Sequence, residues 1–270
     1  MKKLFLQLLL FFAFSTFVYS AFELRGTGAR ETMFSSSAVA LNNSLWSISF
    51  NAAGLASLSK TQISISYSPQ RFGLKEFSSS ALAFAFPLEY GTVAASAHRY
   101  GYEMYNELSS SLAFAKNFQT IAFGVALHYN ALSIQRYGND ATFGIDVGTL
   151  AFLSENVSVG FSATNINAPT ITQKKERLPQ LFSIGVSYYP MKGFTVAVGA
   201  EKDVRYKLSP SVAIEYFPID ELALRVGVHD EPTLFNGGFG IRIHSMNLDY
   251  TASLHQVVGL SHYITVTMQM

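Results

Sequence analysis

Six ionisable side chains in the second half of the chain have the chemical types that a catalytic or binding site would need. They are Asp146, Glu215, Arg225, Arg242, His244 and Asp249. Carboxylates and histidine could exchange protons with a substrate, and arginines could bind an anion. All but His244 stand between two large apolar residues, as Arg225 does between Leu224 and Val226. Because side chains alternate along a strand, such charges would share the face opposite the apolar one.

Four of these residues, Glu215, Arg225, Arg242 and Asp249, fall on four successive predicted strands. We expect them to form an ion-pair cluster inside the protein. The simplest interpretation is that the cluster fills an enclosed interior and neutralises itself, because buried charges need partners. A polar constriction or ligand contact is an alternative, and a catalytic pair is another. His98 and His128 have the same inward parity and are expected to be hydrogen-bonded interior residues rather than metal ligands.

Known catalytic motifs are missing from the sequence. It has no GxSxG, no phosphate-binding loop, no HExxH and no dinucleotide-binding glycine pattern. The absence of cysteine excludes disulfides and thiolate metal sites. We therefore expect no catalytic residue, no metal and no cofactor, and we expect a protein that is not an enzyme. An enzyme in the membrane plane that uses His98, His128 or His244 is kept as an alternative.

The first twenty residues have the three parts of a secretory signal. Met1-Lys2-Lys3 is a basic start, Leu4 to Phe14 is apolar apart from Gln7, and small residues surround a cleavage point between Ser20 and Ala21. An uncleaved anchor is the alternative, but the apolar stretch is short for a span of about 20 residues. The two leader lysines account for the change in net charge from +1 to −1 on cleavage. This near-neutral balance gives no reason to expect a nucleic-acid partner.

From Thr61 onward apolar residues recur at every second position, which is typical of strands. Residues 21–60 lack this alternation and predict a compact N-terminal region with short helical turns. The predicted strands are 61–68, 79–88, 91–100, 107–117, 119–135, 141–153, 156–166, 180–190, 194–204, 209–218, 222–230, 235–245, 246–255 and 260–269. The pair within 235–255 could also be one bent strand. About fourteen strands of roughly ten residues fit an outer-membrane barrel.

The alternative for this strand pattern is a soluble β-sandwich. Only 14% of the residues are charged, whereas soluble domains have about 25%. The face opposite the large apolar one consists mostly of Ala, Gly and Ser, so no charged outer surface would remain on a sandwich. An arginine facing lipid at mid-depth would cost about 2–4 kcal/mol, and the strand charges avoid that parity. The sequence therefore predicts an all-β, antiparallel transmembrane β-barrel over 61–270 in the bacterial outer membrane, in contact with its lipid.

Three ordered regions of the sequence carry a family likeness. The first runs from Gly28-Ala29-Arg30 through Ala38-Val39-Ala40 to Asn51-Ala52-Ala53-Gly54-Leu55. The second contains Asn165, Leu178-Pro179 and Ile184-Gly185-Val186-Ser187-Tyr188. The third contains Glu215-Tyr216, Leu224-Arg225-Val226-Gly227, Gly238-Phe239-Gly240-Ile241-Arg242, Leu248-Asp249-Tyr250 and Gly259-Leu260-Ser261-His262. In this combination the chain resembles FadL-like outer-membrane proteins, and within them the PorV/PorQ branch.

The resemblance implies a barrel of fourteen strands with residues 21–60 folded inside it as a hatch. Its hatch motif would be Asn51, Ala52, Ala53 and Gly54, although Ala52 replaces the family's proline and Met270 replaces the usual terminal aromatic residue. The resemblance also implies a function in transport of small hydrophobic molecules or in protein secretion. A transported molecule would pass small inner residues such as Ala83, Ala113 and Gly124. The alternative is a structural or interaction barrel, a type IX secretion accessory with no conducting pore, whose partners are secretion-system proteins.

Overall fold

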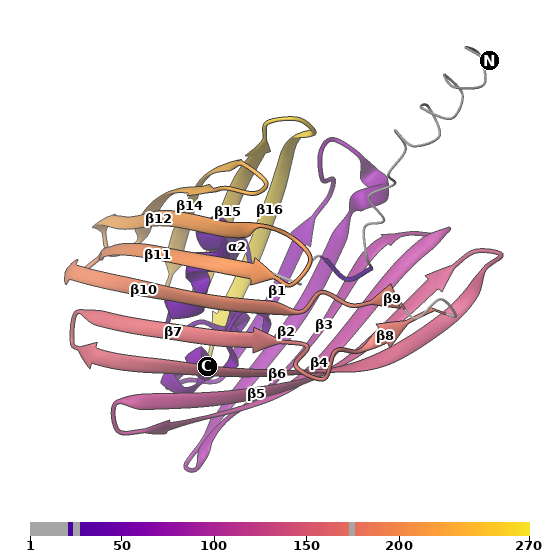
Figure 1. Cartoon of the computed structure of the whole chain (residues 1–270). Helices are drawn as coiled ribbons and strands as arrows, with labels where there is room; N and C mark the ends of the chain where they lie inside the picture. Colours follow the sequence, from indigo (N-terminus) through magenta and orange to yellow (C-terminus); the bar gives the residue numbers. More distant parts are fainter. Residues whose placement is uncertain (1–20, 24–27, 173–175) are drawn as a thin grey trace, which may run out of the picture.

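Fourteen antiparallel strands form a closed barrel (Figure 1). The computed structural model describes residues 21–23, 28–172 and 176–270. The barrel strands are β1 (Gln62–Ser68), β2 (Ser79–Leu88), β3 (Gly91–Tyr102), β4 (Tyr105–Phe118), β5 (Ile121–Ile134), β6 (Gly138–Ser154), β7 (Val157–Thr164), β10 (Leu181–Met191), β11 (Phe194–Asp203), β12 (Leu208–Ile219), β13 (Leu222–His229), β14 (Leu234–Ile243), β15 (Met246–His255) and β16 (Gly259–Gln269). The predicted fold class is confirmed, and 235–255 forms two strands.

Strand β1 closes the barrel because it pairs with β2 on one side and with β16 on the other. The two-residue rhythm separates the two faces of the wall, as β2 illustrates. Ala81, Ala83 and Ala85 are buried inside, whereas the side chains of Leu82 and Phe84 are exposed on the outside. Large apolar residues thus point away from the lumen and small residues line it.

The two ends of the barrel differ in how the strands are connected. At one end, which we name the short-turn end, each of the six hairpins has a two-residue turn, as at Glu89–Tyr90 and His244–Ser245. The opposite end, the long-loop end, has one two-residue turn at Glu103–Met104 and otherwise longer connections, including 69–78 and 165–180. These contain three short elements that the sequence did not predict: η4 (Lys75–Phe77), β8 (Thr170–Ile171) and β9 (Glu176–Arg177).

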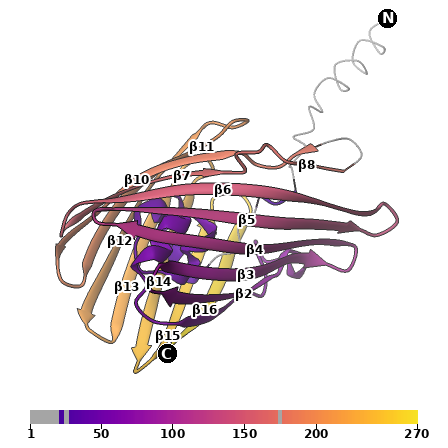
Figure 2. The ribbon, with the colours of Figure 1, turned by 90° about the horizontal axis from the view of Figure 1, so that it is seen from below.

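The N-terminal segment, residues 28–57, lies inside the barrel (Figure 2). It comprises α2 (Ala29–Phe34) and three 3-10 helices, η1 (Ser35–Ala40), η2 (Leu45–Ser49) and η3 (Ala52–Ser57). Short polar caps start the last two, since the Ser44 hydroxyl accepts from the Trp46 N–H and the Asn51 side chain accepts from the Ala53 N–H. The segment contacts all fourteen barrel strands, so it spans the lumen from wall to wall.

The expected signal peptide, residues 1–20, lies outside the described residues. Among the residues that the structure describes, no helix is long and apolar enough to cross a membrane.

Candidate functional site

Three of the predicted lumen charges meet at the short-turn half of the barrel. Arg225 on β13 donates from Nε to Glu215 Oε2 on β12 and from Nη1 to Asp249 Oδ1 on β15, both at 2.6 Å. Glu215 and Arg225 are direct cross-strand neighbours, and their side chains are each 3% exposed. On the intervening strand β14, Gly240 leaves room for the bridge, because a Cβ there would collide with Asp249 and Arg225. The structure thus brings Glu215, Arg225 and Asp249 together.

A fourth member of the cluster, Arg30, comes from α2. Its Nε and Nη2 donate to the two oxygens of Glu215, each at 2.8 Å, in the bidentate geometry that arginine makes with carboxylates. Burial by itself lowers the pKa of Arg30, but the attraction and hydrogen bonds of Glu215, together with the nearby Glu31 and Asp249, raise it above its ordinary value, so the guanidinium stays charged. Arg30 was not predicted as a site residue, because it lies where the sequence lacks alternation and parity gives no information. Its place in the Gly28-Ala29-Arg30 motif was the available signal.

The neighbouring Glu31 is buried in the lumen beside this cluster. It accepts a hydrogen bond from the Ser44 hydroxyl at 2.6 Å, and Arg30 Nη1 lies 3.7 Å from its Oε1. Burial raises the pKa of the Glu31 carboxyl, and the attraction of Arg30 opposes that rise. Glu31 therefore differs from Glu215, which is held by two guanidinium groups.

Arg242 and His244 stand apart from the ion pairs. The Arg242 guanidinium carbon lies 4.1 Å from the centre of the Phe217 ring, and no described carboxylate lies within 4.0 Å of the guanidinium nitrogens. His244 is exposed in the turn between β14 and β15. Both residues line a cavity of about 370 Å³ at the short-turn end, which Arg30, Arg225 and Asp249 also border. The four charges that were predicted to form one cluster are therefore divided. Glu215, Arg225 and Asp249 are joined by ion pairs, and Arg242 lies apart from them.

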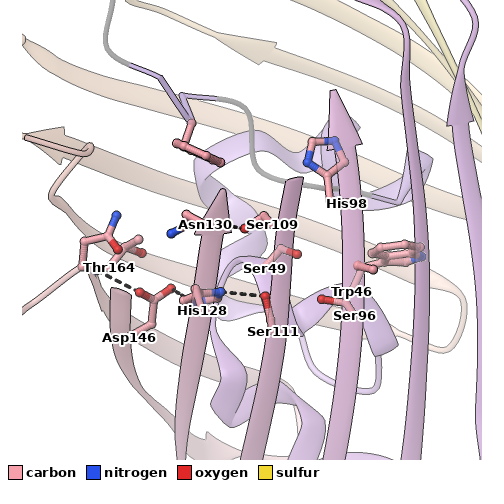
Figure 3. Close-up of a pocket in the computed structure, with 13 residues that line it drawn as sticks. Trp46, Ser49, Ser96, His98, Ser109, Ser111, His128, Asn130, Asp146 and Thr164 are labelled. Atoms are coloured by element: carbon pink, nitrogen blue, oxygen red, sulfur yellow. Dashed lines mark hydrogen bonds and ion pairs between the residues drawn. The ribbon is translucent and has the colours of Figure 1, made fainter. Parts of the chain in front are cut away.

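Asp146 lies in a different part of the lumen, on the inner face of β6 (Figure 3). Its Oδ2 lies 2.9 Å from Nε2 of His128 on β5, and its Oδ1 accepts from the Asn165 N–H at 2.8 Å. Nδ1 of His128 lies 2.7 Å from the Ser111 hydroxyl on β4. With His98 and Trp46 these residues border a cavity of about 70 Å³. Asp146 was predicted to face the lumen, but its partner is a histidine rather than the arginine cluster.

The order Ser111, His128 and Asp146 suggests nucleophilic catalysis, but two features weigh against it. Acyl transfer needs N–H donors aimed at a developing oxyanion, and the backbone around Ser111 is paired with β3 and β5. In addition, His128 Nε2 makes no hydrogen bond of suitable geometry, although Asp146 is near. We interpret the group as a polar network that satisfies lumen side chains. Within the described residues no cluster of three or more His, Asp or Glu could hold a metal ion.

The predicted hatch motif lies where the N-terminal segment meets β5 and β6. Asn51 Nδ2 donates to the Val39 and Thr149 carbonyls at 2.7 and 2.9 Å, so it joins the segment to itself and to β6. Ala52 and Ala53 press against Gly124 on β5, where a Cβ would collide with their backbone atoms. At Gly54 a Cβ would strike Ser47 and the Leu41 carbonyl. The motif is therefore a point of close approach, and all four of its residues are buried.

A model of the type IX secretion system membrane protein PorP/SprF family matches residues 28–268. The chain belongs to the PorP/SprF family. The matched residues include the N-terminal segment and all fourteen strands, so the family assignment covers the whole described barrel. No curated protein sequence matches the chain.

Solved structures resemble this PorP/SprF-family chain in fold. The toluene transporter TbuX of Ralstonia pickettii has a TM-score of 0.70 at 11% identity, over 93% of this chain and 100% of that one. The toluene transporter TodX of Pseudomonas putida has a TM-score of 0.66 at 11% identity, over 92% and 98%. A FadL homologue of Pseudomonas aeruginosa has a TM-score of 0.61 at 10% identity, over 92% and 99%. At such identities the likeness concerns the fold alone. The predicted likeness to FadL-like barrels is confirmed for the fold, whereas the PorV/PorQ branch stays a prediction.

One expectation about the lumen of this PorP/SprF-family barrel is wrong. Ala83, Ala113 and Gly124 were expected to leave room for a passing ligand. Instead, Ala83 and Ala113 pack in one buried cluster with Trp46 and Leu55 of the N-terminal segment. Gly124 is in contact with the backbone of Ala52–Ala53. Small residues line the wall because the segment approaches it closely, so they do not mark an open path.

Proposed function

We propose that this chain is an outer-membrane accessory of type IX secretion, and that its lumen stays closed while it handles partner proteins at its loops. The observation that carries the proposal is the N-terminal segment, which contacts every strand of the barrel. A lumen filled in this way fits an interaction protein better than an open channel. Membership of a type IX secretion membrane family supports the same assignment.

The proposal includes the organisation of the chain. Residues 1–20 would be removed as a signal peptide, 21–60 would act as a hatch, and 61–270 would form the barrel. Because outer-membrane barrels have short periplasmic turns and longer external loops, the short-turn end would face the periplasm. The finer assignment to the PorV/PorQ type rests on sequence motifs, whereas the matching family model is PorP/SprF. The proposal is therefore made at the level of the secretion system.

Exposed apolar side chains at the long-loop end support a role in partner binding. Tyr137, between β5 and β6, is 88% exposed, and Val257, between β15 and β16, is 85% exposed. Both lie in loops, beyond the ends of the lipid-facing strands. Apolar residues that are neither in the lipid belt nor buried are candidates for contact with another protein.

Photo-crosslinking in cells tests the secretion role. A photo-reactive amino acid placed at Tyr137 or Val257 is expected to capture secreted cargo or another barrel subunit. Tyr90, which is 72% exposed in a short turn, is the matched control at the opposite end. Isolation of only a lone barrel from both loop positions, with secretion unchanged after deletion of the gene, would contradict the proposal.

Passage of small hydrophobic molecules is the second candidate. Two similar structures are named as toluene transporters, and Trp46 borders both the 70 Å³ and the 370 Å³ cavities on either side of the segment. Passage through the barrel would require the segment at Trp46 to move so that the two cavities connect. Liposome uptake of toluene by the intact barrel and by a variant lacking residues 28–60 tests this candidate. No uptake by either protein, with barrel formation verified by a heat-dependent gel shift, would exclude it.

A further inference from the structure

The cavity at the short-turn end contains an arginine whose charge is not matched. Arg30 and Arg225 direct their guanidinium donors to Glu215 and Asp249. Arg242 borders the same cavity of about 370 Å³, yet among the described residues it has no ion-pair partner. Its guanidinium faces the Phe217 ring, which orients the planar group without occupying its hydrogen-bond donors. These donors therefore remain available to a ligand.

The carboxylates near the cavity are already engaged by other groups. Asp249 accepts from Arg225, and Glu215 accepts from both Arg30 and Arg225. Glu31 accepts from Ser44, and its Oε1 lies 3.7 Å from Arg30 Nη1. Among the described residues none of these carboxylates forms an ion pair with Arg242, and the Arg242 side chain is exposed, so the cavity offers its guanidinium to solvent.

Neutral hydrogen-bonding side chains complete the wall of the cavity. Amides and one imidazole border it, from the N-terminal segment and from strand ends on either side: Asn42, Asn43, Gln62, His244, Asn247 and Gln269. Amide N–H groups can add hydrogen bonds to an oxygen that an arginine already holds. Arginine's fork of donors matches carboxylate and phosphate groups in particular.

We propose that this cavity binds the carboxylate or phosphate group of a small polar solute, with Arg242 as the principal ligand. The site would be open to the periplasm under the orientation given above. It depends neither on a secretion partner nor on movement of the N-terminal segment. It can therefore be present or absent whichever function the barrel performs.

Trp46 provides the measurement, since it is the single tryptophan of the chain and borders the cavity. The full barrel in detergent is titrated with sodium phosphate and, separately, with sodium acetate, while sodium chloride keeps the ionic strength constant. Saturable changes in Trp46 emission, matched by heat in isothermal titration calorimetry, are expected for at least one anion. The two titrations also decide between phosphate and carboxylate as the preferred group.

Substitutions of Arg242 decide whether it is the ligand. Arg242→Gln is expected to weaken binding about tenfold or more, which is about 1.4 kcal/mol. Arg242→Lys keeps the positive charge but loses the forked arrangement of donors. Its affinity for the anion should lie between those of wild type and Arg242→Gln. Arg136→Gln, at an exposed arginine of the long-loop end, should bind like wild type.

Two results would overturn the proposal. One is the absence of saturable binding of either anion in both fluorescence and calorimetry. The other is equal affinity in wild type and Arg242→Gln, which would place the anion elsewhere. If Arg242→Gln does not show the heat-dependent gel shift of a folded barrel, wild type is compared with Arg242→Lys instead. Equal anion affinity of wild type and Arg242→Lys would then overturn the proposal.

Discussion

The two halves of the N-terminal segment are attached to the barrel by different kinds of contact. The first half, α2 with η1, contacts β7 and β10–β16, and its central link is the ion pair between Arg30 and Glu215. The second half, η2 with η3, contacts β1–β6 and packs Trp46 and Leu55 onto alanines of the wall. Both halves pack closely on the wall, as Ser37 does on Gly199 and Ala52 on Gly124, but within the described residues the first half adds a buried ion pair to the barrel and the second half does not.

This difference has consequences for what each attachment tolerates. An ion pair inside a barrel fixes orientation, but removing one partner leaves a charge that has lost its compensation. Close apolar packing has no such charge to lose, yet a single added carbon can prevent it where backbones touch. The first attachment should therefore be sensitive to a loss of charge, and the second should be sensitive to a gain in volume.

Glu215→Gln is expected to have the largest effect, because it removes the carboxylate shared by Arg30 and Arg225. Breaking a buried ion pair from one side costs about 3–5 kcal/mol. Urea unfolding of the barrel in lipid or detergent, followed by Trp46 fluorescence, measures the free energy of unfolding. Glu201→Gln is the matched control, since this glutamate is partly exposed on β11, accepts a hydrogen bond from the Ser183 hydroxyl and lies outside the cluster of Arg30, Glu215 and Arg225. Equal losses in the two variants would contradict a special role for the Arg30 link.

Gly124→Val tests the apolar attachment by adding volume on β5. A side chain there collides with the backbone of Ala52 and Ala53, and overpacking of this kind costs about 1–3 kcal/mol. We expect the barrel to form while η3 becomes sensitive to added protease. Gly237→Ala on β14 is the control, because a Cβ there meets nothing within 4 Å. If η3 stays protected in Gly124→Val, the close contact does not hold it.

The sequence predicted the wall of this barrel better than its contents. Alternation fixes the strands because each residue faces either lipid or lumen, and the inward parity of Glu215, Arg225 and Asp249 follows from the same rule. Parity does not tell which inward residues lie at the same height along the barrel axis, because that height depends on the register between strands. Asp146 therefore pairs with His128, whereas Arg242 has no ion-pair partner among the described residues. Parity also does not distinguish small residues that leave space from those that a second layer covers, as at Gly124.

Glu31→Gln is expected to have the smallest effect and separates the two acids of the ionic attachment. Burial raises the pKa of the Glu31 carboxyl, so the folded state binds its proton more tightly than the unfolded chain does. The stability that this carboxyl contributes is therefore present below its ordinary pKa and is lost as the pH rises through the raised value.

Glutamine imitates the neutral form of Glu31 and can still accept a hydrogen bond from Ser44, so at neutral pH the free energy of unfolding of the variant should lie within about 1 kcal/mol of wild type. In unfolding measurements at about pH 4 and about pH 8, the difference should shift in favour of the variant at the higher pH. A loss at about pH 8 as large as that of Glu215→Gln would mean that Arg30 needs both carboxylates, and the two acids would then form one charged unit.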